Sequence, residues 1–183
     1  MKKILGISGS PRHNGNSEVA LSRVLSNCGK HYSVSIYNVS QMNIHLCDGC
    51  LVCEETGCCH QKDDMASLIE QVESADVIII STPVYFDGLP AICKNILDRT
   101  NPLCNRIGGK EAYILTFGQA DETSWERACV SLENYFEVMN IAVVGKYSFY
   151  AREKNDVADN VEILKKLDTI SASIIERCKK DNG

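Results

Sequence analysis

The chain has 183 residues, of which 44% are hydrophobic and 23% are charged, and its formal net charge is −5. This length suits a single domain spanning residues 1–183, and the acidic balance argues against a nucleic-acid partner, which would need a basic surface. No apolar run is long enough to span a membrane and the N-terminus lacks the apolar segment of a secretion signal, so we expect a cytoplasmic protein without a membrane partner.

The first predicted element is an apolar strand over residues 3–7, which leads through a polar loop at 8–17 into a helix. Such a loop gathers backbone N–H groups around one point, and the helix N-terminus adds about half a positive charge. Arg12 adds a permanent positive charge. Because the loop has neither a G-x-G-x-x-G pattern nor a P-loop, it predicts a mononucleotide phosphate site, with an ordinary strand-to-helix turn as the alternative. The side chains expected to donate to phosphate are those of Ser8, Ser10, Asn16 and Ser17.

Strands and helices alternate along the rest of the chain. Strands are predicted at residues 31–39, 75–82, 112–117 and 141–150, and helices at 65–74, 89–99, 122–139 and about 156–180. This alternation predicts an α/β fold, a doubly wound five-stranded parallel sheet with helices on both faces. Polar loops at 8–17, 82–88 and 116–121 follow strand ends, where such sheets bind ligands, so we expect the three loops to form one site.

An irregular, cysteine-rich insertion is predicted at about residues 40–62. In a cytoplasmic chain, ten cysteines point to metal binding or redox chemistry rather than to disulfides. Cys47, Cys50 and Cys53, followed by Cys58 or Cys59, have the compact spacing with which one loop wraps a 4Fe-4S cluster. Zinc is the competing metal, and thiols without a metal are the third alternative. The scattered cysteines are expected to be small buried apolar residues: Cys28, Cys93, Cys104, Cys129 and Cys178.

Several short motifs occur together in the chain: Gly9-Ser10-Pro11-Arg12, Gly15-Asn16-Ser17, the cysteine run before Asp63-Asp64-Met65, Thr82-Pro83-Val84-Tyr85, and Lys94 with Asp98-Arg99. In this combination the chain resembles the flavodoxin-like NAD(P)H-dependent FMN reductases, and more narrowly the branch that contains the iron–sulfur flavoproteins. The likeness covers residues 3 to about 120.

The resemblance implies a flavodoxin-like sheet of order 2-1-3-4-5 and FMN as the cofactor, with its phosphate on the 8–17 loop and Arg12 pairing the dianion. It implies that residues 83–88 pass along the isoalloxazine ring and that 116–118 lie against its other side. It also favours Cys59 over Cys58 as the fourth cluster ligand. The residues expected at the ring are Pro83, Val84, Tyr85, Phe86, Gly88, Thr116 and Gly118, although Tyr85 and Phe86 alternatively cap the core.

The function implied is that of an FMN-dependent oxidoreductase in which the flavin carries the chemistry, so no catalytic side chain is predicted. Electrons would come from NAD(P)H or, through the cluster, from a ferredoxin-type donor, and would pass to a quinone, an azo or nitro compound, a second flavin or oxygen. The alternatives are an electron carrier without a substrate of its own and a zinc-binding interaction module.

Apolar residues in the 82–88 loop and the 40–62 segment predict a homodimer or homotetramer, with both segments near the subunit contact. Because the cysteine segment follows the second strand, we also expect a bound cluster to lie close to the flavin.

Overall fold

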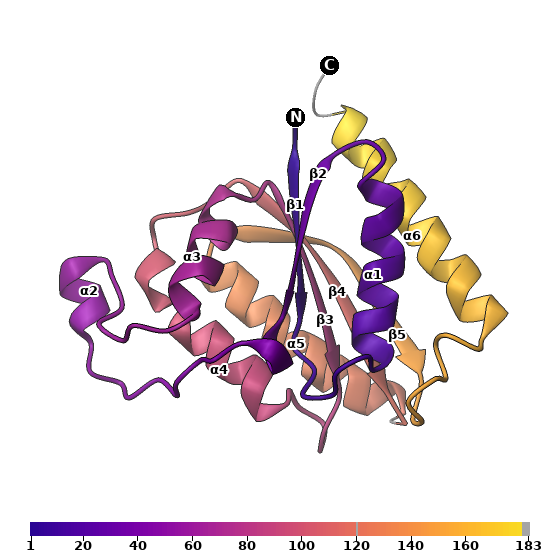
Figure 1. Cartoon of the computed structure of the whole chain (residues 1–183), viewed down its shortest axis with the longest axis horizontal. Coiled ribbons are helices and arrows are strands. Elements are labelled where there is room, and N and C mark those ends of the chain that lie inside the picture. Colours follow the sequence, from indigo (N-terminus) through magenta and orange to yellow (C-terminus); the bar gives the residue numbers. More distant parts are fainter. Residues whose placement is uncertain (120, 181–183) are drawn as a thin grey trace.

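The computed structural model describes residues 1–119 and 121–180, and its five strands form one sheet of order β2-β1-β3-β4-β5 (Figure 1). All neighbouring strands are parallel, which confirms the predicted flavodoxin-like topology. Residue 120 of the predicted 116–121 loop and the last three residues of the predicted domain lie outside the described residues. The strands are β1 (Lys3–Ser8), β2 (Ser33–Asn38), β3 (Val77–Pro83), β4 (Lys110–Gly118) and β5 (Ile141–Tyr150).

Helices cover both faces of the sheet (Figure 1). One face carries α1 (Asn16–Cys28) and α6 (Val161–Lys180). The other carries α3 (Met65–Ser74), α4 (Ala91–Arg99) and α5 (Glu122–Val138). None of the described helices combines the length and the apolar composition that a membrane crossing requires.

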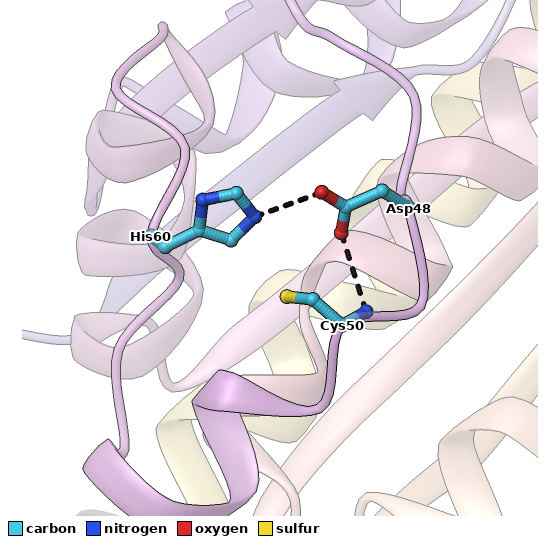
Figure 2. A group of neighbouring side chains, drawn as sticks. All are labelled: Asp48, Cys50 and His60. Carbon is cyan, nitrogen blue, oxygen red and sulfur yellow. Dashed lines mark hydrogen bonds and ion pairs between the residues drawn. The ribbon is translucent and has the colours of Figure 1, made fainter.

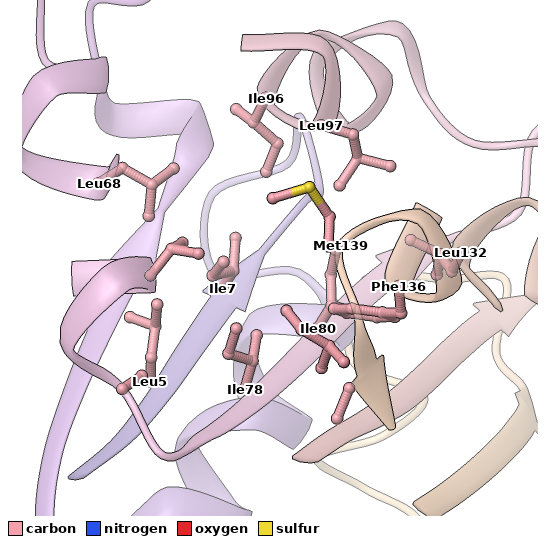
Figure 3. Packing of buried hydrophobic residues seen from close by; sticks show 14 of the residues in the cluster. Leu5, Ile7, Leu68, Ile78, Ile80, Ile96, Leu97, Leu132, Phe136 and Met139 are labelled. Atoms are coloured by element: carbon pink, nitrogen blue, oxygen red, sulfur yellow. The ribbon is translucent and has the colours of Figure 1, made fainter. Parts of the chain in front are cut away.

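The core has two layers because successive strand residues point to opposite faces. Ile78 and Ile80 of β3 pack with Leu5 and Ile7 beneath α3, α4 and α5 (Figure 3). Their neighbours Val77 and Ile79 pack instead with the residues of α1 and α6. The central strands β1, β3 and β4 are therefore buried on both faces, and the carboxyl ends of the strands are left for a ligand.

The last helix starts later than predicted. The Asp156 carboxylate accepts the backbone N–H groups of Arg152 (2.7 Å) and Glu153 (2.8 Å), which folds this stretch into a turn. Asn160 then caps α6 by accepting from the N–H of Ile163 (3.1 Å). Side-chain bonds of this kind compete with helix formation, so the apolar pattern that begins at Val157 is helical only from Val161.

The insertion at 40–62 is not wholly irregular. It begins within the single-turn helix η1 (Val39–Gln41) and contains the short helix α2 (Val52–Thr56). Figure 1 shows α2 at the far end of the molecule from α6, beyond α3 and α4.

Candidate functional site

A cavity of about 170 Å³ lies where four strands end. The three predicted loops line it together, and the segment after β5 forms a fourth wall. This fourth wall was not predicted, although β5 ends at Tyr150 and the rule that ligands bind at strand ends points to the residues that follow. The lining residues are Ser10, Arg12, Asn16, Ser17, Pro83, Val84, Tyr85, Phe117, Gly118, Gln119, Ala151 and Arg152.

One end of this cavity suits an anion. Helix α1 begins after Gly15, and no side chain caps it. Its first backbone hydrogen bond runs from the N–H of Val19 to the carbonyl of Gly15 (3.0 Å). The N–H groups before it have no intrahelical acceptor, as at any helix start. Arg12 and Arg152 both line the cavity, and the Arg12 guanidinium donates to the Arg152 carbonyl (3.3 Å). The Arg12 side chain thus stands near a helix N-terminus, and Arg152, whose guanidinium pairs with Glu153 (3.3 Å), lines the same cavity.

Asn16 connects the first loop to the fourth wall. Its amide N–H donates to the carbonyl of Glu153 (2.7 Å), and its side-chain oxygen accepts the N–H of Val157 (3.1 Å). The amide that the sequence pattern assigned to phosphate thus also fixes the segment that carries Arg152. Nearby, the Ser10 hydroxyl accepts the N–H of Arg12 (3.1 Å), which shapes the loop.

Four of the predicted flavin-site residues do not line the cavity. Ser8 is buried at the end of β1, and Thr116 is buried in β4, where its hydroxyl lies 2.7 Å from that of Ser148. Phe86 and Gly88 belong to a tight hairpin instead. The structure therefore brings eight of the twelve predicted residues into one cavity.

The hairpin follows β3, and its two middle residues have a strained backbone. Tyr85 and Gly88 exchange two backbone hydrogen bonds, each 3.0 Å. Phe86 and Asp87 have φ values of 48° and 61°, which is the left-handed pattern of a type I′ turn. The Asp87 carboxylate bonds the Ser124 hydroxyl and Arg127 of α5. These bonds hold a fully exposed Phe86 at the tip of the turn.

A second cavity, of about 360 Å³, contains the predicted metal ligands. It is lined by the Cys47, Cys50, Cys53 and Cys59 residues of the insertion, whereas Cys58 is not among the lining residues. A fifth cysteine, Cys104, lines it from the segment after α4. Of the five cysteines expected to be buried, Cys104 alone is half-buried, and no local pattern links it to the others.

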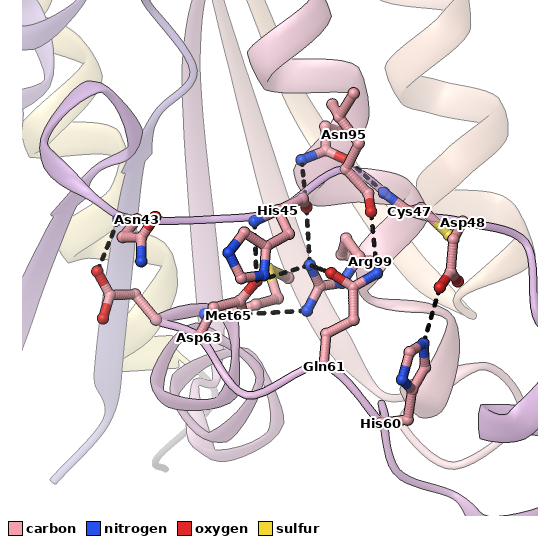
Figure 4. Close-up of polar contacts among 12 residues, drawn as sticks. Asn43, His45, Cys47, Asp48, His60, Gln61, Asp63, Met65, Asn95 and Arg99 are labelled. Carbon is pink, nitrogen blue, oxygen red and sulfur yellow. Dashed lines mark hydrogen bonds and ion pairs between the residues drawn. The ribbon is translucent and has the colours of Figure 1, made fainter.

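The cysteine segment is fastened to α4 by residues one helical turn apart (Figure 4). Asn95 accepts the N–H of Cys47 (3.0 Å) and donates to the carbonyl of His45 (3.1 Å). Arg99 donates to the same carbonyl (2.7 Å). Just beyond the helix, the Asn101 amide donates to the sulfur of Cys53 (3.2 Å).

Arg99 is only 2% exposed, and its ionic partner is Asp63. This ion pair joins α4 to the residue two positions before α3. The adjacent Asp98 pairs with Lys94 within α4. Sequence reasoning did not identify Asp63 as the partner because it lies 36 residues away.

Asp48, Cys50 and His60 form a separate polar cluster at the edge of this cavity, with ligand atoms within 4.8 Å of one another (Figure 2). The Asp48 carboxylate accepts from His60 (2.9 Å) and from the N–H of Cys50 (3.3 Å). Hydrogen bonds from the Cys50 thiol and from His60 hold the pKa of Asp48 below its ordinary value. All three residues are exposed, so the cluster is accounted for as hydrogen bonding within the loop.

The two cavities have no lining residue in common. Trp125 lies against Gly118 at the first cavity, and Tyr135 lines the second. Ten residues of α5 separate them, which is about 15 Å along a helix. Within one chain the expected closeness of cluster and flavin is therefore not seen, because the insertion extends sideways past α4 instead of folding over the sheet edge.

Solved structures with this fold include flavoproteins. A flavone reductase superposes with a TM-score of 0.77 at 19% identity, over 98% of this chain and 64% of that one. An FMN-dependent NADH-azoreductase from Bacillus anthracis, in complex with FMN, superposes with a TM-score of 0.67 at 15% identity, over 97% and 99% of the two chains. At these identities the likeness concerns the fold.

Sequence relatives are nearer. An iron-sulfur flavoprotein of Methanocaldococcus jannaschii is 31% identical over 150 residues, which are 78% of this chain and 76% of that protein. One from Archaeoglobus fulgidus is 30% identical over 183 residues, covering 95% and 79%. The family of NADPH-dependent FMN reductases matches residues 2–156. The resemblance read from the motifs is thereby confirmed, and the chain belongs to the NADPH-dependent FMN reductase family, in the branch of the iron–sulfur flavoproteins.

Proposed function

We propose that the protein is an FMN-dependent oxidoreductase with an iron–sulfur centre, which passes electrons from NAD(P)H or a ferredoxin-type donor to a small acceptor. The observation that carries the proposal is the four-walled cavity at the strand ends, with an uncapped helix start and two arginines at one end. When bound there, FMN would supply the redox chemistry that the side chains cannot.

The residues of this cavity fit FMN. Ser10, Ser17, Arg12, Arg152 and the first N–H groups of α1 would hold the phosphate, because they combine donors with positive charge. Pro83, Val84 and Tyr85 would lie along one side of the ring. Gly118 and Gln119 would lie on the other, where backbone N–H groups stabilise negative charge on a reduced ring.

The second cavity fits an iron–sulfur centre. Four thiols surround it, and Asn101 already donates to one of the sulfurs. A zinc ion bound at about 2.3 Å would draw four thiolates to within about 4 Å of one another. Among the described residues, the four cysteines do not form such a group within 4.8 Å. A multi-iron centre, in which each thiolate reaches a different iron, does not need the four sulfurs to surround a single ion.

Anaerobic purification tests both cofactors together. FMN, iron and zinc are counted per chain, and the absorption spectrum is recorded before and after NADH, NADPH or reduced ferredoxin is added. We expect about one FMN and four irons per chain. Protein that takes up no FMN would overturn the oxidoreductase, and zinc in place of iron would overturn the centre. Turnover of NAD(P)H with a quinone separates an enzyme from a carrier that exchanges electrons only with proteins.

The predicted homodimer or homotetramer is part of the proposal. Leu46 and Leu51 of the cysteine segment are exposed, as are Phe86 of the hairpin and Val138 of α5. Covering these side chains would remove apolar surface from water. A second copy would also allow electrons to pass from the cysteine-lined cavity of one chain to the proposed FMN cavity of the other, although the two cavities are apart within one chain. Light scattering at micromolar concentration tests this, and a monomeric mass would contradict it.

A further inference from the structure

Arg99 places a buried positive charge at the second cavity, which Cys47, Cys50, Cys53 and Cys59 line and which is called the thiol cavity below. The residue is 2% exposed and is among those that line the cavity, whereas its partner Asp63 is not. Arg99 therefore contacts both its counter-ion and the wall of the space that the four cysteines line. Arginine keeps its charge at any pH at which the protein is folded, so this cavity wall is permanently positive.

One nitrogen of the Arg99 guanidinium has no hydrogen-bond partner. Nη1 donates to the carbonyl of His45, to the side-chain oxygen of Gln61 (3.2 Å) and to the carboxylate of Asp63, and Nη2 donates to Asp63 (Figure 4). The Nε–H has no solvent contact and no acceptor. A buried charged donor without a partner is more costly than a neutral one, so native proteins rarely leave one unexplained.

We propose that Arg99 sets the reduction potential of the iron–sulfur centre, by donating its Nε–H to a sulfur of that centre and by holding a positive charge against it. This rests on the proposed centre in the Cys47–Cys59 segment. The Cys59 thiolate is one acceptor within electrostatic reach of the guanidinium, and a sulfide of the cluster is the other.

The direction of the effect follows from the charges. One-electron reduction by a ferredoxin-type donor adds one negative charge to the centre, with no bond or proton transferred. A fixed cation and an N–H···S bond stabilise the more negative state, so Arg99 raises the potential. Asp63 offsets part of this, since it adds a negative charge on the far side of Arg99. Arg99 is a positioning and tuning residue for electron entry, with no contact to the substrate implied.

Redox titration of the intact, iron-loaded protein tests the proposal, with dithionite as the reductant and the electron paramagnetic resonance signal as the readout. Arg99→Gln combined with Asp63→Asn removes both buried charges while keeping polar groups of similar size. We expect the one-electron reduction constant to fall about tenfold, which is 59 mV. Asp63→Asn alone leaves the cation uncompensated, so its potential should rise. Arg99→Lys keeps the charge but loses the Nε–H, and its potential should fall less than in the double variant.

Arg106→Gln is the matched control. Arg106 donates to the carbonyl of Gly57 (2.7 Å) in the same segment, but it is half exposed and does not line the cavity. Its loss should leave the potential unchanged.

Equal potentials in all iron-loaded variants would overturn the role of Arg99. Reduction potentials that shift in the same direction in Asp63→Asn and in the double variant would overturn it too. Such a shift would mean that both substitutions loosen the loop and admit water to the centre. If even Arg99→Lys carries no iron, Arg99 is an anchor for the segment and the proposal is wrong. Wild-type protein without iron would instead overturn the centre itself, and this inference with it.

Discussion

The guanidinium of Arg99 and the carboxylate of Asp63 form a bidentate pair, with N···O distances of 2.9 and 3.0 Å and both side chains buried. The pair joins the end of α4 to the segment that leads into α3. Burial raises the pKa of Asp63, but hydrogen bonds from Arg99 and from the N–H groups of His45 and Met65 outweigh it, so the pKa lies below its ordinary value.

This lowered pKa makes the stability depend on pH. A carboxylate whose folded pKa is depressed stabilises the fold fully above its unfolded pKa of about 3.9, and this contribution is lost as the pH falls through the folded value. We expect Asp63→Asn to lack that acid-dependent loss and to cost about 3–5 kcal/mol at neutral pH, because it leaves a buried charge unpaired. Denaturant unfolding at several pH values measures both. The exposed pair of Arg23 and Asp168 is the control, and Asp168→Asn should change stability little.

Arg12 and Arg152 are both expected to contribute to FMN affinity. Each lines the cavity beside the start of α1, and a hydrogen bond to a charged group contributes about 1.5–3 kcal/mol. Replacing either by Ala should weaken binding by that amount, as measured by titrating the flavin-free protein with FMN. Arg23→Ala should bind as the wild type does, because Arg23 lies about two turns further along α1, pairs with Asp168 and does not line the cavity. Unchanged affinity in Arg12→Ala would remove that residue from the site.

Helix α3 and the central strand β3 could be predicted from local sequence patterns, because several independent signals agree at each. The acidic pair before Met65 and the helical spacing that follows place α3 at the bounds the structure has, and the apolar run at 77–80 marks the central strand. Where a side chain competes with the backbone, the prediction was wrong, as at Asp156, whose turn delays α6.

In the candidate site, too, some residues could be predicted from the sequence and others could not. Residues next to strand ends, such as Ser10 and Gly118, could be placed by topology alone. Cys104 and the partner of Arg99 could not, because both depend on how the insertion lies against α4. Long-range contacts of this kind have no signature in a single sequence.

The hairpin at Phe86 should become more stable when the aromatic ring is removed. Its φ of 48° is costly for Phe, whereas Asn tolerates the left-handed region and is favoured in type I′ turns. We expect Phe86→Asn to increase the free energy of unfolding of the separate subunit by about 0.5–1 kcal/mol, and to weaken the proposed contact between copies, which the ring would otherwise help to form. Val130→Asn removes an exposed apolar side chain from α5, where Val and Asn have similar helix propensity, and should be nearly neutral. A loss of stability in Phe86→Asn would mean that the ring packs against something in solution.

Gly9 has no room for a side chain. A Cβ at this position would lie 2.6 Å from the sulfur of Cys93, and the Gly9 N–H is bonded to the carbonyl of Ser81 (2.8 Å). Gly9→Ala should therefore destabilise the protein by about 1–3 kcal/mol, as overpacking does. In a Cys93→Ala background the cost should be smaller, which a double-mutant cycle from denaturant unfolding measures. Equal costs in the two backgrounds would show that the sulfur is not the obstacle.

The adjacent cysteines Cys58 and Cys59 give the sharpest test of the ligand set. Both belong to the insertion, but Cys59 lines the thiol cavity together with Cys47, Cys50 and Cys53, whereas Cys58 is exposed and does not. Cys59→Ser should therefore lose iron and the absorbance that depends on it, and Cys58→Ser should keep both. Metal loss should loosen residues 45–61 and leave the sheet intact, because a loop that folds around a metal is ordered by it. Limited proteolysis and the iron count per chain read out the two effects separately.

FMN content should be the same in both variants, since the two cavities have no residue in common. Loss of iron in Cys58→Ser together with retention in Cys59→Ser would show that Cys58, and not Cys59, is the fourth ligand. Full iron content in both variants would indicate Cys104 as the fourth ligand.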